Sequence, residues 1–396
     1  MAERVVIAGV GMVPFKKPGQ SEPYDQMGAK AAQAALKYAG IDYAKVQQAY
    51  AGYVYADSCA GQAALYHVGT TGIPVVNVNN NCGSGSTAFA LAAQAVGGGA
   101  VECALAVGFE EMSPGALGVV FPEKTIPGGI FVQPMLERLE FTEDEAKFPP
   151  AILFFGAQAQ VLMEDFGVSE KALARVAVKA RRHAAENPYA VFRDPLTEEQ
   201  ILLQPPIFRG IRKLFACPPT CGAASVIVCS EKFARQNGIS SDVTLIGSGF
   251  CSDKQEFFEG DRLDLLLRAL SKATAKQAYE NAGVGPEDID VIELHDCFTS
   301  NEIMLYNALG LCDEGDMERF VMNNENTYGG QVVICPSGGL LSKGHPLGAT
   351  GLAQITELTW QLRGQAGGRQ VPNARTALQH NAGLGSASFV HIFQRQ

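Results

Sequence analysis

One cysteine, Cys82, stands between a short apolar run and a glycine-rich turn, a place where a thiol can act as a nucleophile. Residues 76–86 read Val-Asn-Val-Asn-Asn-Asn-Cys-Gly-Ser-Gly-Ser, and the chain from Gly85 to Val96 has the pattern of a helix. A thiol at a helix amino terminus meets free backbone N–H groups and the positive end of the helix dipole, which favour the thiolate. From these residues alone, a nucleophile and a buried structural cysteine are equally good interpretations.

A histidine occupies a matching turn late in the chain. Residues 342–351 read Ser-Lys-Gly-His-Pro-Leu-Gly-Ala-Thr-Gly, and an internal repeat aligns Gly348 with Gly85. Equivalent turns of two pseudo-twofold copies meet at the strand ends, so we expect His345 to lie near Cys82. There it could act as the base for the thiol. A lone histidine is more often a satisfied polar group, and it is the related position that favours the catalytic interpretation.

A second histidine and a second cysteine follow a predicted strand at 291–294. If the extended conformation continues, His295 and Cys297 project to one face and Asp296 to the other. A pair of this kind could be half a metal site, but no further ligand pair accompanies it. We therefore interpret His295 as a hydrogen-bond donor, Cys297 as a proton-transfer thiol and Asp296 as structural.

The last strand runs into another glycine turn, at 377–385. Backbone N–H groups around Gly383 could point at a developing oxyanion. An ordinary junction between a strand and a turn would have the same sequence pattern.

The elements that must position these residues occur twice. The strand pattern Val5–Gly11 returns at Val243–Gly249, 238 positions later (249 − 11), and the helix end at Ala34–Gly40 returns at Ala275–Gly283. Strands and helices alternate in both copies, which predicts α/β halves with mixed, mostly parallel sheets. We expect a first half at 1–111 and 216–240, an inserted loop domain at 112–215, and a second half at 241–396.

The insertion carries apolar segments and two clusters of basic residues. One cluster holds Arg209, Arg212 and Lys213, the other Lys179, Arg181 and Arg182. Such a segment suits an acyl chain joined to phosphates, although plain packing or dimerisation would also use it. The expected substrate-binding residues are Arg209, Arg212, Lys213 and Ser342.

The composition limits the other classes of function. The chain has 396 residues, a net charge of −10, 47% hydrophobic and 18% charged residues, which argues against disorder and against a nucleic-acid partner. The ten cysteines form no zinc-type pairs, so no metal is expected. No apolar stretch approaches membrane-spanning length, and no signal region opens the chain. We expect a cytoplasmic protein in a reducing compartment.

The residues at 79–87, 289–297 and 326–381 resemble the thiolase superfamily, specifically its sterol-carrier-protein-x (SCP-x) type thiolases. The resemblance covers nearly the whole chain and includes Tyr-Gly-Gly at 328–330, Gly-His-Pro at 344–346 and Gln-His-Asn at 379–381. The His-Asp-Cys-Phe tetrapeptide at 295–298 distinguishes the SCP-x type from other thiolases. Most other thiolases have Asn-Glu-Ala-Phe there and take a second cysteine from a late Cys-x-Gly motif. Departures are Gly83 for alanine, Ala382 for leucine, Cys221 for aspartate, and an unfamiliar stretch at 121–150.

This resemblance implies thiolase-like duplicated halves, layered α-β-α-β-α, and a thiolase activity. Cys82 would carry the acyl group, His345 would accept its proton, and Cys297 would move the proton at the α-carbon. His295 with His345, and backbone N–H groups of Cys82 and the Gly383 region, would form two oxyanion holes. Coenzyme A and acyl-CoA would be substrates, with no permanently bound cofactor, and the protein would be a homodimer or homotetramer.

Three alternatives stay open at this point. A ketoacyl-synthase-like enzyme would favour two histidines with one cysteine, whereas this chain offers Cys-His-Cys. A thiolase-like acyltransferase or aldolase acting on a steroid or aromatic acyl substrate would need a small OB-fold partner protein, and the aldolases usually lack the nucleophilic cysteine. A non-catalytic lipid-CoA binder would not need all three reactive positions.

Overall fold

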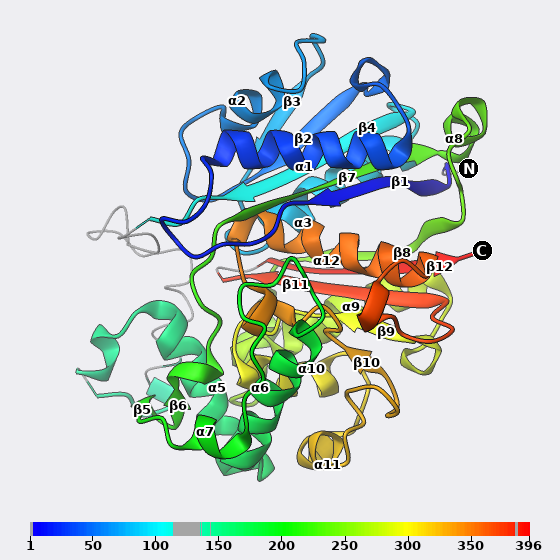
Figure 1. Cartoon of the computed structure of the whole chain (residues 1–396). Helices are drawn as coiled ribbons and strands as arrows, with labels where there is room; N and C mark the ends of the chain where they lie inside the picture. Colours follow the sequence, from blue (N-terminus) through cyan, green and yellow to red (C-terminus); the bar gives the residue numbers. More distant parts are fainter. Residues whose placement is uncertain (1–2, 114–134, 136, 143, 385–386) are drawn as a thin grey trace.

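The computed structural model describes residues 3–113, 135, 137–142, 144–384 and 387–396. Ten strands of this described part form one sheet, in the order β10-β9-β11-β12-β8-β1-β7-β4-β2-β3 (Figure 1). A two-stranded ribbon pairs β5 (Pro206–Phe208) with β6 (Ile211–Arg212).

The large sheet is two copies of one arrangement joined at their edges. From the junction outward, the first half runs β1 (Val5–Met12), β7 (Gly222–Ser230), β4 (Cys103–Glu110), β2 (Gln48–Gly52) and β3 (Val75–Val78). The second half runs β8 (Val243–Cys251), β12 (Ala387–Arg395), β11 (Thr376–Gly383), β9 (Val291–Glu293) and β10 (Val333–Ile334). The equivalent strand orders confirm the duplication. The halves join where Val6 pairs with Thr244.

The expectation of mostly parallel sheets is wrong for the centre of each half. Strand β7 runs antiparallel to both of its neighbours, β1 and β4, and β12 runs antiparallel to β8 and β11. Only the outer pairs, β4-β2-β3 and β11-β9-β10, are parallel. In each half the last strand returns to lie between the first strand and the parallel set, and a returning strand of this kind is antiparallel to its neighbours.

Helices cover both faces of the sheet and give five layers. Helix α1 (Tyr24–Ala39) and α2 (Ala60–Tyr66) pack on the outer face of the first half, and α9 (Arg268–Ala282) and α10 (Thr299–Ala308) on that of the second. Between the halves lie α3 (Ser84–Gly97) and α12 (Leu347–Arg363), whose apolar residues share one core with strands of both halves (Figure 1). The α/β, α-β-α-β-α architecture is therefore confirmed. Short helices α8 (Glu231–Asn237) and α11 (Met317–Met322) complete the halves.

The glycine stops of the repeat fall where the sequence predicts them. Helix α1 is followed by Gly40 at φ +69° and α9 by Gly283 at φ +68°, and each glycine N–H bonds back to a carbonyl of the last turn. This left-handed conformation costs little only at glycine.

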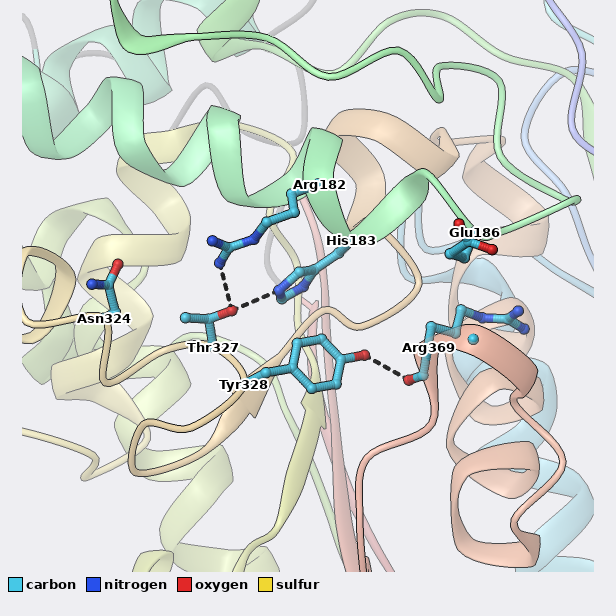
Figure 2. Close-up of a pocket in the computed structure, with 8 residues that line it drawn as sticks. Arg182, His183, Glu186, Asn324, Thr327, Tyr328 and Arg369 are labelled. Carbon is cyan, nitrogen blue, oxygen red and sulfur yellow. Dashed lines mark hydrogen bonds between the residues drawn. The ribbon is translucent and has the colours of Figure 1, made fainter.

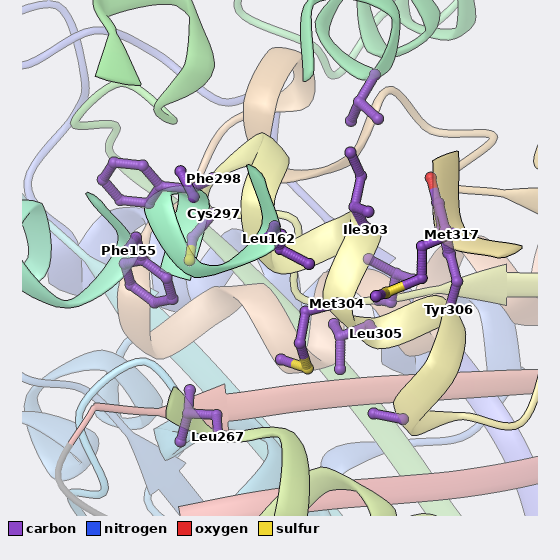
Figure 3. Close-up of a cluster of buried hydrophobic side chains, with 14 of the residues drawn as sticks. Phe155, Leu162, Leu267, Cys297, Phe298, Ile303, Met304, Leu305, Tyr306 and Met317 are labelled. Carbon is purple, nitrogen blue, oxygen red and sulfur yellow. The ribbon is translucent and has the colours of Figure 1, made fainter. Parts of the chain in front are cut away.

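The described part of 112–215 packs against the second half. Helices α5 (Pro150–Phe166), α6 (Glu170–Ala184) and α7 (Glu198–Leu202) share a hydrophobic core with α9 and α10. Figure 3 shows Leu162 of α5 beside Ile303, Met304 and Leu305 of α10, with Phe155 facing Phe298. The last two rings stack at 4.7 Å. The boundaries of the expected three-part division stay a prediction, and part of the stretch 121–150 lies outside the described residues.

Candidate active site

Cys82 is presented by a tight turn between β3 and α3. Asn81 adopts φ +51°, and the N–H groups of Gly83 and Ser84 donate to the carbonyls of Asn80 and Asn81 at 3.0 Å each. Glycine at position 83 is followed directly by the first turn of α3. Cys82 as a whole residue is half-buried, and its thiol lies 3.6 Å from the Asn81 side-chain oxygen. The helix amino terminus expected at this cysteine is therefore present.

His345 is presented by the equivalent turn, before α12. The hydroxyl of Thr350 donates to the carbonyl of Pro346 at 2.9 Å and lies 2.7 Å from His345 Nδ1. Because that hydroxyl hydrogen is already used, the oxygen accepts from Nδ1–H, which assigns the proton of the neutral ring to Nδ1. Nε2 then carries a lone pair, and it is buried with no hydrogen-bond partner among the described residues. A ring in this state can accept a proton.

Glycines let the two turns meet. A Cβ on Gly85 would lie 2.5 Å from the carbonyl oxygen of Gly348, and one on Gly351 would lie 2.1 Å from Ser86 Oγ. The first turns of α3 and α12 therefore touch backbone to backbone, which larger residues would prevent. As a result one ligand atom each of Cys82, His295 and His345 lie within 4.8 Å of one another. The prediction that the repeat brings His345 to Cys82 is confirmed as geometry.

His295 reaches the same place from the end of β9. Its ring is buried and meets the His345 ring edge to face, with centroids 5.2 Å apart. Its Nδ1 lies 3.1 Å from the amide nitrogen of Asn381, whose own oxygen accepts from Ser86. An amide nitrogen donates, so Nδ1 accepts and the ring proton is at Nε2. His295 is thus arranged as a donor, whereas His345 is arranged as an acceptor.

Cys297 adds a second thiol that is almost fully buried. It interacts electrostatically with Cys82 and with a third thiol, Cys217, whose backbone N–H donates to the carbonyl of Cys297 at 2.8 Å. Asp296 turns to the backbone of residues 340 and 341 instead, which fits the structural role expected for it.

Burial determines the charge state of the site. It raises the pKa of the Cys82 thiol to about 12, although hydrogen bonds from the backbone N–H groups of Leu384 and Cys82 lower it. The Cys297 thiol pKa is also well above its usual value, because of burial first and then the neighbouring thiols. Burial lowers the pKa of His295 to about 3 and that of His345 well below its usual value. The resting pair is a thiol beside a neutral imidazole, so the helix terminus alone does not produce the expected thiolate.

The strand end at Gly383 lies against the Cys82 turn. A Cβ on Gly383 would lie 2.0 Å from the carbonyl oxygen of Asn80, so only glycine fits there. The backbone donor that reaches the Cys82 sulfur from this strand end is that of Leu384, one residue further on.

Cys82, His295 and His345 could in principle hold a metal ion, because each offers one ligand atom within the same 4.8 Å. Zinc would need the lone pair of His295 Nε2, but the Asn381 amide nitrogen next to Nδ1 keeps the proton on Nε2. The donor set therefore fits a hydrogen-bonding site better than a zinc site.

A cavity of about 530 Å³ opens beside these groups. Cys217, Pro219 and Leu341 are among the residues that line it, and Pro219 forms a β-bridge with His345. Two expected substrate-binding residues line it, Lys213 and Ser342, together with Arg181 of the other basic cluster and one cation that the sequence did not indicate, Lys17. The Arg181 guanidinium and the Lys17 ammonium lie 4.5 and 5.0 Å from the ring centre of Phe192.

The other two expected cations do not reach this cavity. Arg209 pairs with Glu145 at 2.6 Å and lies over the Phe141 ring at 4.0 Å. Arg212 pairs with Glu170 at 2.6 Å and donates to the carbonyl of Gln204. Both guanidinium groups are held in internal contacts of the insertion.

A second cavity of about 420 Å³ lies elsewhere, between α6, the 324–328 loop and the 367–369 turn that follows α12 (Figure 2). Arg182 and His183 both contact Thr327, and Tyr328 donates to the carbonyl of Arg369. No cysteine lines this cavity, so it is separate from the thiols.

Comparison with known proteins identifies the class of protein. The model of the thiolase N-terminal domain matches residues 5–201, and that of the thiolase C-terminal domain-like family matches 253–395. Sterol carrier protein 2 of Rattus norvegicus is 44% identical, over 99% of this chain and 72% of that protein. The benzoylsuccinyl-CoA thiolase subunit BbsB of Thauera aromatica is 33% identical, over 97% of this chain and 96% of that protein. The solved structure of an Ltp2-ChsH2(DUF35) aldolase has a TM-score of 0.80 at 22% identity and covers 99% of this chain and 98% of its own.

The chain therefore belongs to the thiolase family, and it is an enzyme of the acyltransferase type. Within that family it is similar to the sterol-carrier-protein-2 thiolases, as the His-Asp-Cys-Phe tetrapeptide indicates. Among the described residues, no helix has both the length and the apolar character needed to cross a bilayer.

Proposed function

We propose that the protein cleaves 3-oxoacyl-CoA with coenzyme A, or runs the reverse Claisen condensation, through an acyl group carried on Cys82. The observation that carries the proposal is the meeting of Cys82 with two histidines of opposite hydrogen-bonding character. The unpartnered Nε2 of His345 can take the Cys82 proton, and His295 Nε2–H can donate to a developing oxyanion.

The reaction needs only groups of this site. The Cys82 sulfur attacks the 3-keto carbon as its proton passes to His345, and the new oxyanion is stabilised by hydrogen bonds. The bond between C2 and C3 then breaks, leaving the acyl group on Cys82 and an enolate of acetyl-CoA. Cys297 gives that enolate a proton and becomes a thiolate, which then takes the proton from the thiol of a second coenzyme A. The coenzyme A sulfur takes the acyl group from Cys82, and the Cys82 sulfur recovers its proton from His345. Because the resting thiol pKa is about 12, proton transfer has to accompany attack.

The cavity beside the thiols supports coenzyme A as the substrate carrier. Its lining is mostly apolar, which suits the pantetheine arm, and Lys17, Arg181 and Lys213 are cations that suit phosphates. The name of the relative BbsB also includes a CoA thioester. Coenzyme A would bind as a substrate, and no resident cofactor is required. A cytoplasmic location and a homodimer or homotetramer complete the proposal.

The test is acetoacetyl-CoA thiolysis by the purified protein, with mass spectrometry of the acyl-enzyme. We expect Cys82→Ala to lose both the activity and the acyl adduct. Cys297→Ala should still form the adduct but turn over slowly, because the enolate lacks its proton donor. Cys312→Ala changes a half-buried thiol outside this cluster and is the matched control, which should resemble wild type. Full activity in Cys82→Ala would refute the proposal.

A second candidate is a partner-dependent acyltransferase or aldolase acting on a steroid or aromatic acyl group. The observation in its favour is the likeness to a relative named as a subunit and to an aldolase solved with a DUF35 protein. The observation against it is the retained Cys82. Inactivity of the protein on straight-chain 3-oxoacyl-CoA substrates, with activity gained on adding a small OB-fold partner, would favour this candidate.

A further inference from the structure

Asp296 lies between His295 and Cys297 in the chain, and its carboxylate is fully buried against a turn of the second half. The N–H of Leu340 donates to Oδ1 at 2.8 Å, and the N–H of Leu341 faces Oδ2 at 3.4 Å. A Cβ on Gly339 would lie 2.0 Å from Oδ2. The turn is therefore seated directly on the carboxylate, with no space between them.

That turn leads to His345 within a few residues. Residues Gly339–Lys343 form one π-helical turn, Gly344 follows at φ +123°, and His345 comes next. We propose that Asp296 is a positioning residue: its carboxylate holds the turn that carries His345 in register with the strand end that carries His295 and Cys297. This inference rests on the proposed function, because it gives Asp296 a part in the same reaction.

A second carboxylate at the same strand end, that of Glu293, binds the same segment. Glu293 accepts from the N–H and the hydroxyl of Ser337 at 3.0 and 2.8 Å, and it pairs with the Lys343 ammonium at 3.6 Å. Residues 337 to 343 are thus bound to β9 at both ends. Since each contact ends on a charged group in a dry interior, a shift of either carboxylate would move the turn.

The charges around Asp296 are not balanced. Facing it are Glu302 on α10, Lys179 on α6 and Cys335 after β10, while Glu293 and Lys343 lie next to it on β9 and the turn. Three buried carboxylates therefore meet two buried ammonium groups. An oxygen of Glu302 also has no hydrogen-bond partner among the described residues. One carboxylate of the group is in excess, and a buried charge without a partner costs stability.

The pKa of Asp296 reflects its burial first and this excess second. Burial, and then repulsion from Glu302, raises it to about 7, although the N–H of Leu340 and the Lys179 ammonium lower it. The folded pKa lies above the ordinary value of 3.8, so protonation of Asp296 favours the folded state. That contribution is complete below about pH 4 and is lost as pH rises to about 7. The ionised form, which accepts two N–H groups, therefore exists at a cost to stability.

Replacement of Asp296 by asparagine separates the effect of this residue on the position of the turn from its effect on the stability of the protein. Asp296→Asn removes the excess charge, but its amide nitrogen is a donor and cannot face a second backbone N–H. At pH 8 we expect the urea midpoint of Asp296→Asn to equal or exceed that of wild type. The kcat for acetoacetyl-CoA thiolysis should fall about tenfold because the turn carries His345, and the KM for CoA should rise as well because Leu341 and Ser342 of the same turn line the cavity. Protonation of Asp296 turns one of its acceptor oxygens into a donor, so the wild-type kcat should fall between pH 8 and 6, and this fall should be weaker in the variant.

The control is Asp242→Asn, another carboxylate held by an ion pair, which contacts Arg363 at 2.8 Å at the far end of α12. It should lower the urea midpoint and leave the kcat and its pH profile unchanged. A wild-type kcat and pH profile in Asp296→Asn would overturn the proposal, as would a loss of kcat matched by a lower midpoint. If the variant does not fold, a wild-type kcat that stays constant between pH 8 and 6 would also overturn the proposal. Activity in Cys82→Ala would instead show that the proposed function, and not this inference, has failed.

Discussion

Gly85 and Gly348 face each other where the two central helices begin: a Cβ on Gly85 would lie only 2.5 Å from the carbonyl oxygen of Gly348. The two residues are 263 positions apart (348 − 85) and occupy equivalent places in the repeat. Their contact is the reason that Cys82 and His345, each three residues before its glycine, meet in one site.

Alanine at position 85 should separate the helices. The added methyl group would meet backbone, which cannot rotate away, so we expect Gly85→Ala to lose about 1 to 3 kcal/mol of stability and most of its thiolase activity. Gly97→Ala is the matched control at the other end of the same helix. Its methyl group would meet a Val5 side-chain carbon at 3.4 Å and the Glu3 carbonyl oxygen at 3.8 Å, both ordinary contact distances, so stability should hold or rise. Urea unfolding and thiolysis rates measure both, and an active Gly85→Ala would contradict this account of the contact.

The sequence predicts the arrangement of the site well because the chain is duplicated. Matching two short local patterns is then enough to bring together residues that are far apart in the sequence. Once the glycine turns at 85 and 348 are matched, pseudo-twofold symmetry places His345 beside Cys82 without any knowledge of the sheet. The strand directions were harder to predict. Antiparallel β7 and β12 are as apolar and as buried as parallel strands, so their pattern gives no sign of direction.

The sequence predicts the roles of the basic residues least well, because arginine and lysine serve many purposes in a protein. Arg209, Arg212 and Lys213 are neighbours in the sequence, but only Lys213 reaches the cavity, because internal carboxylates hold both arginines. Lys17 reaches it from the other end of the chain, which no local pattern could indicate. Thr350 lies in the quoted turn, five residues after His345, and helical spacing on α12 could have identified it.

Thr350 should control which nitrogen of His345 carries the proton. Thr350→Val keeps the shape but removes the acceptor of Nδ1–H, leaving a buried donor unpaired and favouring the Nε2–H form, which is no base for Cys82. We expect kcat to fall at least about tenfold with little change in KM. Thr350→Ser keeps the hydroxyl and should retain most of the activity. Equal loss in both variants would mean that the methyl group, and not the hydroxyl, is what matters.

Glu110 should make stability depend on pH. Its buried carboxylate accepts from the N–H groups of Val54, Tyr55 and Gly348, and burial raises its pKa to about 7. Since the folded pKa exceeds the unfolded one, the contribution to stability is complete below about pH 4.5 and is lost by about pH 7. The change corresponds to about 3 kcal/mol.

Glu110→Gln cannot ionise and isolates this effect. Between pH 4 and pH 8 the free energy of unfolding of the variant, relative to wild type, should shift in its favour by about 3 kcal/mol or less, measured by urea denaturation. Other titrating groups cancel in that comparison. Glu164→Gln, an exposed carboxylate on α5, should show no comparable shift. A difference between Glu110→Gln and wild type that stays constant with pH would show that Glu110 does not titrate in this range.

Alanine substitutions of Lys213 and of Arg212 should have different effects on the KM for CoA and on stability, although the two residues are adjacent. If the cavity holds coenzyme A, Lys213→Ala removes one cation near its phosphates, which is worth about tenfold in the KM for CoA at low salt and less as salt rises. Arg212→Ala instead breaks the ion pair with Glu170 and should lower thermal stability while leaving that KM unchanged. Steady-state thiolysis at two salt concentrations and thermal unfolding separate the two effects. A raised KM in Arg212→Ala alone would place the phosphates elsewhere on the insertion, as the sequence first suggested, and would remove Lys213 from the CoA site.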